Sequence, residues 1–474
     1  MQSAITAIGG YLPLLRLDRQ AMARELGWSG LPMSRAGRRS VAGWDEDPMT
    51  MAVEAARALV QTPPAALRFA STSAWFTERA QATIALDALA LPRSVRTTDA
   101  ANSRRAGTGA LLDALLGQAD EVIMAAEKRP TRPGSAAQLG YGDGAAAVRT
   151  GSGPGARLVG HACLSHDLVD RYASRGHPTP YVYEERFVRD ITISEIIGPV
   201  VAAACNEAGI APRTLAHVAV AEPVSGCWSS VARKAGIEAT NHCEALGQAA
   251  GDLGAAHALF GFGLALASAR PGDHLLLLGF GSGADALVFE MTGPVAGAEA
   301  FPALLAEGQA LTSASRFLSL TGGLDLDWGM RAEFEQKAQA SVLERVGRDM
   351  IGFIGGRDSL GSVQFPKSHF PVNPAIETAE MLADVRLADL EAEVVSVTAD
   401  RLNYSPDPPF DFGLVQFDNG ARVLMEMVDR PPPGFAVGDR LRMRLRIKSM
   451  HERLGFRTYF WKGAPRCRPT LGQG

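Results

Sequence analysis

The sequence is poor in features that would assign a protein to a class at once. Its 474 residues include only five cysteines, an odd number that never forms a Cys-x-x-Cys pair, which argues against a disulfide framework and against a cysteine-based metal site. No apolar run reaches the roughly 18–20 residues of a membrane span, and the first residues lack the basic-then-apolar pattern of a signal peptide. We therefore expect a cytoplasmic protein without a membrane partner.

The chain also lacks an excess of basic residues. Its 47 lysines and arginines are outnumbered by 51 aspartates and glutamates, so the net charge of −4 provides no field that attracts nucleic acid. One exception is local, where basic residues alternate along a short segment: Arg440, Arg442, Arg444, Arg446 and Lys448. Because no aromatic stacking platform is interleaved with them, we interpret this row as a solvated or partner-facing strand face and expect no nucleic-acid partner.

What the chain does contain is a loose internal repeat of about 150 residues. Each copy combines a helix of small residues, a buried strand and a further strand reached through glycines, at 107–117, 121–126 and 140–149 and again at 254–269, 274–279 and 286–290. Apolar strands without alternation, separated by helices, predict a mostly parallel sheet covered on both faces. The length favours two or three domains, because a single core stops growing near about 250–300 residues.

The C-terminal third has a different pattern. A polar connector, with an amphipathic helix predicted over 331–340, precedes five short alternating strands, at 392–398, 412–417, 422–428, 440–447 and 457–461. Turn signals separate the strands, among them Asp418-Asn-Gly420. This number of strands favours a small β-barrel of the OB type.

Several motifs occur in an order that resembles the hydroxymethylglutaryl-CoA synthase branch of the thiolase superfamily: 5–13, 47–56, 106–108, 142–147 and 280–283. Residues from about 350 onward resemble the OB-fold proteins that accompany thiolases. The resemblance implies an α/β thiolase-like fold, with two βαβαβ-type halves in αβαβα layers, followed by a small all-β OB-fold barrel. The implied domains are residues 1–155 and 156–295 for the two halves, 296–355 for a helical connector, and 356–474 for a degenerate zinc ribbon with the OB-fold domain.

The position of the family's cysteine nucleophile is occupied by Arg104, four residues before the threonine of the Gly107-Thr108 pair. A thiolate at a helix N-terminus forms a labile thioester, and a guanidinium group cannot do so. The neighbouring Ser103 could serve only with an adjacent base and a one-residue shift of the elbow, and a hydroxyl that caps the helix is the more common role. Arg104 or Arg105 could instead hold a carboxylate or stabilise developing negative charge.

The other polar positions of the family pattern also differ. Ala221 stands at the histidine position with Glu222 beside it, and Thr72 stands at the glutamate position. Asp252 corresponds to the family's asparagine, and both a catalytic and a helix-capping role remain open for it. His257, one turn later, could approach the cavity, although a lone histidine is more often a satisfied core residue. We regard Glu222, Asp252 and His257 as candidate acid or base residues.

The glycine loop at Phe280-Gly-Ser-Gly283 remains, and we expect Gly281, Ser282 and Gly283 to present N–H groups to a thioester oxygen. The resemblance places four zinc ligands at Arg357, Leu360, Pro371 and Ile376, none of which is a thiolate. No zinc or other metal is therefore expected.

These observations leave two functions open. The first is an acyltransferase-type enzyme that performs Claisen or retro-Claisen chemistry on a β-keto acid or a β-ketoacyl-CoA without the cysteine nucleophile. In that case CoA or acyl-CoA is a substrate, and no cofactor is bound permanently. The second is a catalytically inactive scaffold that partners an active thiolase. The resemblance implies a homodimer, or a heteromer with a thiolase.

Overall fold

A computed structural model describes residues 3–30, 36–324, 326, 340–402 and 405–471. Its largest element is a nine-stranded sheet. The strands are β1 (Ala4–Tyr11), β4 (Ala66–Ala70), β5 (Arg96–Ala100), β6 (Glu121–Glu127), β7 (Gly144–Gly151), β8 (Ala156–Ser165), β11 (Leu215–Val220), β12 (His274–Phe280) and β13 (Gly283–Met291). Their order is β11-β12-β13-β8-β1-β7-β6-β4-β5, and the two halves join where β1 pairs with β8.

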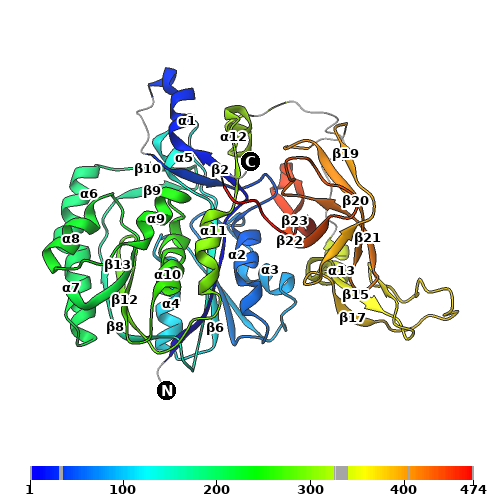
Figure 1. Ribbon diagram of the computed structural model, residues 1–474, viewed down its shortest axis with the longest axis horizontal. Coiled ribbons are helices and arrows are strands. Elements are labelled where there is room, and N and C mark those ends of the chain that lie inside the picture. Colours follow the sequence, from blue (N-terminus) through cyan, green and yellow to red (C-terminus); the bar gives the residue numbers. More distant parts are fainter. Residues whose placement is uncertain (1–2, 31–35, 325, 327–339, 403–404, 472–474) are drawn as a thin grey trace.

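Helices lie between the two halves of the sheet and on both outer faces. The central helices α4 (Ala106–Leu116) and α10 (His257–Ser268) each contact strands of both halves. The first half is covered by α2 (Pro48–Ala56) and α3 (Gln81–Ala88), and the second by α7 (Gly198–Glu207) and α8 (Cys227–Ala235) (Figure 1). This arrangement is the expected αβαβα layering. Small residues permit it, because a Cβ atom added at Gly263 of α10 would lie 2.2 Å from the ring of Phe301.

The expectation of a mostly parallel sheet is wrong. The pairs β4–β5, β4–β6 and β11–β12 are parallel, whereas β1–β7, β1–β8, β6–β7, β12–β13 and β8–β13 are antiparallel. Gly281 and Ser282 alone connect β12 to β13, and parallel pairing would need a crossover of a dozen or more residues. The apolar runs indicated burial on both faces but not strand direction.

The smaller elements surround this sheet. A three-stranded sheet contains β2 (Leu15–Asp18), β3 (Arg38–Val41) and β14 (Gln309–Ala310), and a hairpin contains β9 (Arg171–Ser174) and β10 (His177–Val182). The remaining helices are α1 (Arg19–Glu25), α5 (Ala136–Gly140), α6 (Glu185–Ile191), α9 (His242–Ala249), α11 (Phe301–Ala306), α12 (Ala314–Leu320) and α13 (Ala340–Gly352). Most of the helix predicted over 331–340 lies outside the described residues. Among the described residues, no helix is long and apolar enough to cross a membrane.

The C-terminal part forms a small sheet followed by a closed barrel. The sheet contains β15 (Ile354–Arg357), β16 (Val363–Gln364) and β17 (Ala383–Arg386). The barrel strands are β18 (Ala392–Val394), β20 (Phe410–Phe417), β21 (Arg422–Met427), β22 (Arg440–His451) and β23 (Phe456–Pro465), with β19 (Thr398–Asp400) appended to β20. Strand β18 pairs with both β20 and β22 and so closes a five-stranded ring. The predicted barrel is present.

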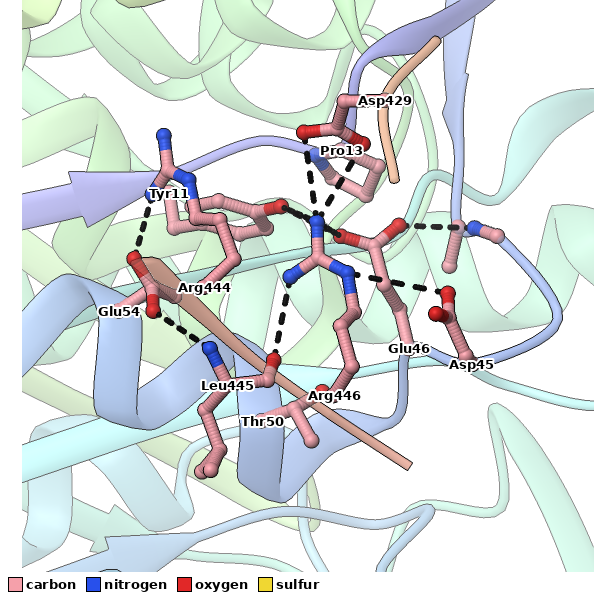
Figure 2. Close-up of polar contacts among 12 residues, drawn as sticks. Tyr11, Pro13, Asp45, Glu46, Thr50, Glu54, Asp429, Arg444, Leu445 and Arg446 are labelled. Atoms are coloured by element: carbon pink, nitrogen blue, oxygen red, sulfur yellow. Dashed lines mark hydrogen bonds and ion pairs between the residues drawn. The ribbon is translucent and has the colours of Figure 1, made fainter. Parts of the chain in front are cut away.

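The barrel is packed against the first half of the sheet, and one hydrophobic cluster runs through both (Figure 1). Charged groups on the facing surfaces are paired. The Glu54 carboxylate of α2 accepts a hydrogen bond from the Leu445 N–H at 3.1 Å and forms an ion pair with Arg444. Arg446 lies 3.1 Å from Glu46 and 3.3 Å from Asp429 (Figure 2).

The alternating basic row therefore has its partner within the same chain. The side chain of Arg446 is 1% exposed and that of Arg444 is 7% exposed, which leaves neither available as a nucleic-acid track. The flanking Arg440 and Lys448 pair with carboxylates of the barrel itself. The row was interpreted as either solvated or facing a partner. Its buried residues, Arg444 and Arg446, face a partner surface of the same chain.

An acidic triplet before α2 supplies most of the opposite charge. Asp47 is the N-cap of α2 and accepts hydrogen bonds from the Tyr459 hydroxyl at 2.8 Å and from Arg457 at 3.1 Å. Asp45, two residues earlier, lies 2.9 Å from the Lys462 ammonium group. The same short segment thus begins a helix and binds the barrel.

Substitution of Glu54 should destabilise the whole chain. Glu54→Gln leaves the buried Arg444 guanidinium without its anion, so we expect the free energy of unfolding to fall by about 3–5 kcal/mol in urea titrations. Asp389→Asn is the matched control, because Asp389 pairs with Arg57 at an exposed position and should contribute at most about 1 kcal/mol. Equal effects of the two substitutions would contradict a buried charge lock.

Acid should weaken the same interface. Burial raises the pKa of the Glu54 carboxyl, but Arg444 and Arg57 outweigh burial and hold it below its usual range; Glu426 and Asp429 are also held low by buried cations. Carboxyls with a depressed folded-state pKa stabilise the fold above their unfolded pKa of about 4, and this stabilisation is lost as the pH falls. We expect Tm to be nearly constant between about pH 6 and 8 and to decline below about pH 5. The decline should be shallower in Glu54→Gln, and parallel curves would argue against the assignment.

Candidate functional site

A cavity of about 520 Å³ lies between the loop before α4, the end of β11, helix α9 and the start of α10. It brings together four of the residues expected to be functional: Arg104, Glu222, Asp252 and His257. The resemblance assigned these residues to catalytic positions or positions beside them, and the structure places all four around one cavity. The volume is in the range of pockets that hold small ligands.

Arg104 lies in the loop between β5 and α4, and a network of ion pairs holds it. Its guanidinium group is 2.7 Å from Asp170 and 3.9 Å from Asp252. Arg129 and Arg171 lie 3.3 and 3.5 Å from the same Asp252 oxygen, and Arg171 lies 3.4 Å from Asp170. Burial, and then the nearby Arg171, lowers the pKa of Arg104. Three cations share two carboxylates, so this network has one positive charge in excess.

Asp252 is a structural anion here. Burial raises the pKa of its carboxyl, but the charges of Arg129, Arg104 and Arg171 outweigh burial and hold it well below the usual range. Its Oδ1 atom accepts a hydrogen bond from the Gly254 N–H at 2.9 Å, two residues along the chain, and Leu253 rather than Asp252 holds the N-cap position of the helical turn that follows. A carboxylate this strongly stabilised is a poor base.

Glu222 is also engaged. Its two carboxylate oxygens accept hydrogen bonds from the N–H groups of Gly226 at 3.0 Å and Trp228 at 2.7 Å, at the start of α8. Although Glu222 lines the cavity, its carboxylate stabilises a helix N-terminus, where a negative charge is favourable. The structure gives it no position from which to act as a base.

His257 is held neutral at the cavity wall. Its Nδ1 atom accepts a hydrogen bond from the Leu253 N–H at 3.2 Å, which places the ring proton on Nε2. Burial lowers the pKa of its imidazole, and the nearby Asp252 offsets this only in part. Among the candidate acid or base residues, His257 is the one whose state suits proton exchange or hydrogen-bond donation.

Ser103 and Arg105 face away from the cavity. The Ser103 hydroxyl donates to the carbonyl oxygen of Gly281 at 2.9 Å and accepts from the Arg105 N–H at 3.2 Å. Arg105 forms an ion pair with Asp285 at 2.9 Å. Neither residue is among those that line the cavity, and the site roles predicted for them stay predictions.

One N–H group of the glycine loop is engaged within the loop itself, and the expected oxyanion hole stays a prediction. The Gly281 N–H donates to the carbonyl oxygen of Gly283 at 2.9 Å, within the loop itself. Gly281, Ser282 and Gly283 are not among the residues that line the cavity. The turn between β12 and β13 is tight, with φ of +49° at Ser282 and +112° at Gly283. Glycine at position 283 adopts such a positive φ without steric cost.

Cys243 lines the cavity but has the properties of an inert thiol. Its Sγ atom lies 3.7 Å from the carbonyl oxygen of His257 and packs against Gly261 of α10. Burial raises the pKa of the Cys243 thiol well above its usual value, and the carboxylates of Asp252, Glu222 and Glu244 raise it further. A nucleophilic cysteine needs the opposite environment.

Sequence reasoning missed four residues of this region. Tyr141 stacks on Arg129, with the guanidinium carbon 3.7 Å from the ring centre, and its hydroxyl accepts a hydrogen bond from Arg171 at 3.1 Å. Asp170 and Arg171 come from the start of the β9–β10 hairpin, and Arg129 lies two residues beyond the end of β6. Arg129 follows a strand end, which is where binding residues of α/β sheets often lie, so that signal was available.

A carboxylate from another strand contacts Thr72, the residue that stands at the family's glutamate position. Glu127, at the end of β6, accepts hydrogen bonds from the N–H and the hydroxyl of Thr72 at 2.8 and 2.9 Å. Glu127 also accepts a hydrogen bond from the Ala255 N–H at 3.3 Å, and it is fully buried. Glu127 is therefore a brace between strand ends and the start of α10, and it does not line the cavity.

The four positions that correspond to zinc ligands do not fit a zinc ion. Arg357, Leu360, Pro371 and Ile376 offer no thiolate or imidazole. Within the described residues, no group of three or more His, Cys, Asp or Glu side chains could hold a metal ion. The loops there are held by hydrogen bonds, since the Gln364 side chain accepts from the Val372 N–H at 2.7 Å and donates to the Phe370 carbonyl at 3.1 Å.

Comparison with known proteins places this geometry in context. No family model matches the sequence. The hydroxymethylglutaryl-CoA synthase of Aeropyrum pernix is 27% identical over 294 residues, which cover 58% of this chain and 81% of that protein. That of Pyrococcus furiosus is 26% identical over 304 residues, with 60% and 85% covered.

Solved structures give the same picture. An HMG-CoA synthase from Bacillus subtilis matches with a TM-score of 0.57 at 17% identity and covers 72% of this chain and 95% of its own. The fold is thiolase-like. The 3-oxoacyl-(acyl carrier protein) synthase III of Pseudomonas aeruginosa, with a TM-score of 0.51 at 18% identity, covers 62% of this chain and all of its own. The thiolase-like part therefore accounts for most, but not all, of the chain.

Alkylation should distinguish the cysteines. We expect iodoacetamide at about pH 8 to modify the exposed Cys467 in the native protein and to leave Cys243 unmodified, because a buried thiol with a raised pKa presents almost no thiolate. Peptide mass spectrometry after quenching measures both sites in one sample, and a denatured sample shows that Cys243 can react once exposed. Preferential labelling of native Cys243 would reveal a cysteine nucleophile after all.

Proposed function

We propose that this protein is a CoA-dependent acyltransferase-type enzyme that makes or breaks a carbon–carbon bond beside a carbonyl, on a β-keto acid or a β-ketoacyl-CoA, without a cysteinyl acyl-enzyme. The similarity to hydroxymethylglutaryl-CoA synthases supports the reaction class. The observation that carries the rest is the Arg104 guanidinium group, which lies in the cavity within 4 Å of two carboxylates.

The charge of the site favours an acidic substrate. An arginine buried among other arginines is costly unless an anion meets it, and the Arg104 network has one positive charge in excess. A carboxylate can accept two parallel hydrogen bonds from a guanidinium group, which fixes its orientation as well as its position. Arg104 would thus bind the carboxylate of the substrate.

In the cleavage direction the thiolate of CoA takes the place of an enzyme thiolate. It attacks the ketone carbon of the β-keto acid, and the carbonyl electron pair moves to oxygen. When the carbonyl re-forms, the bond between the α and β carbons breaks, and its electron pair becomes the enolate of the departing acid, which then takes up one proton. The products are an acyl-CoA and a shorter acid, and condensation is the reverse.

The proposal extends to the remaining parts of the chain. We assign the closed five-stranded barrel to the OB type, fused to the thiolase-like halves. Strand β5 is one of the two edges of the nine-stranded sheet, and its solvent-exposed residues would allow pairing with a second sheet edge. We therefore propose a homodimer, or a heteromer with a thiolase, built on that edge.

A substrate panel tests the function. Purified protein is incubated with acyl-CoAs, CoA and β-keto acids while free CoA and new thioesters are measured. We expect Arg104→Ala to lower kcat/KM by about 10²–10³-fold, because it removes a positioned charge at the reacting group. Arg105→Ala is the matched control, since the neighbouring Arg105 pairs with Asp285 outside the cavity, and Cys227→Ala and Cys243→Ala should also retain activity.

Two outcomes would overturn this assignment. Activity that survives Arg104→Ala but is lost in Cys243→Ala would restore a cysteine mechanism. Protein that is inactive alone, but stimulates an added thiolase, would favour the scaffold function.

A further inference from the structure

A second cation outside the Arg104 network lines the cavity. Arg19, the first residue of α1, is 9% exposed, and its Nη2 atom donates to the carbonyl oxygen of Gly247 on α9. Its Nε atom is buried without a hydrogen-bond partner, and Arg19 forms no ion pair with any residue that the structure describes. Arg19 is therefore a buried guanidinium group whose charge is only partly compensated.

The surroundings of Arg19 make this charge costly. Burial, and then the nearby Arg39, lowers the pKa of Arg19 to about 10, and Asp252 offsets this only in part. Asp252 is itself already shared among Arg104, Arg129 and Arg171. A buried cation in such a place is stabilised when a ligand supplies the missing anion.

We propose that Arg19 is an oxyanion-binding residue of this cavity and that it forms a two-point clamp with Arg104. This inference rests on the proposed function, in which Arg104 binds the carboxylate of a β-keto acid. Arg19 then binds a second oxyanion, either the far carboxylate of a dicarboxylic β-keto acid or a phosphate group of CoA. Both groups match the hydrogen-bonding pattern of a guanidinium group.

Equilibrium binding tests the clamp without any need for turnover. Calorimetry measures the affinities of acetoacetate, 3-oxoglutarate and CoA for the wild type and for Arg19→Met, which keeps the apolar stem and removes the charge. The wild type should bind either the dicarboxylate or CoA about 10- to 100-fold more tightly than Arg19→Met does, while acetoacetate affinity should change little. Arg24→Gln, on the exposed side of the same helix, is the control and should match the wild type.

The pattern of losses identifies the source of the oxyanion. A loss confined to 3-oxoglutarate assigns Arg19 to the acyl group, and a loss confined to CoA assigns it to a phosphate. Equal affinities of wild type and Arg19→Met for all three ligands would overturn the proposal, as would a wild type that binds none of them.

Thermal unfolding separates binding from structure. Without ligand, Arg19→Met should unfold at the same temperature as the wild type or higher, because it removes a buried charge that is only partly compensated. The ligand bound by Arg19 should raise Tm of the wild type more than that of Arg19→Met. Binding that depends on Arg19 without turnover of any substrate would refute the proposed reaction and leave the clamp intact.

Discussion

The structure depends on the pairing of buried guanidinium groups. An ion removed from water costs several kcal/mol unless an opposite charge and further hydrogen bonds compensate it. At the barrel interface the positive charges of Arg444 and Arg446 are compensated by ion pairs. Their partners are the carboxylates of Glu46, Glu54 and Asp429. In the cavity the compensation is incomplete, since Arg19 and the Arg104 network retain positive charge. The paired charges hold the barrel against the thiolase-like halves. The incompletely paired cations of the cavity can be stabilised by an anionic ligand.

Local patterns predicted most of the elements, because hydrophobic period and glycine position act over a few residues. Helices α4 and α10, strands β6, β12 and β13 and the barrel strands lie where the sequence placed them. Strand direction was not predictable from apolar runs alone, and the antiparallel β12–β13 pair shows why, since a two-residue turn decides it. The buried partner of Arg446 was also out of reach, because Glu46 lies some 400 positions away and only tertiary packing brings the two together.

The site divides in the same way. The motifs pointed to Arg104, Asp252 and His257, and the structure places all three around one cavity. It could not show that Asp252 and Glu222 are fully engaged, or that the Gly281 N–H is used within its own loop, because hydrogen bonds decide both. In the proposed reaction, substrate charge and CoA therefore supply what relatives obtain from a side-chain nucleophile, and the protein contributes position and electrostatics.

The distance in sequence between Glu54 and Arg444, which is 390 positions, has a consequence for biosynthesis. At about 5–20 residues per second, the ribosome needs roughly 20–80 seconds to deliver the second partner after the first. During that interval the nascent thiolase-like layers present an uncovered face that carries four acidic residues, Asp45, Glu46, Asp47 and Glu54, beside its apolar ones. Because carboxylates remain well hydrated, this face stays soluble while the last strands are still being made, where a purely apolar surface would attract other unfinished chains.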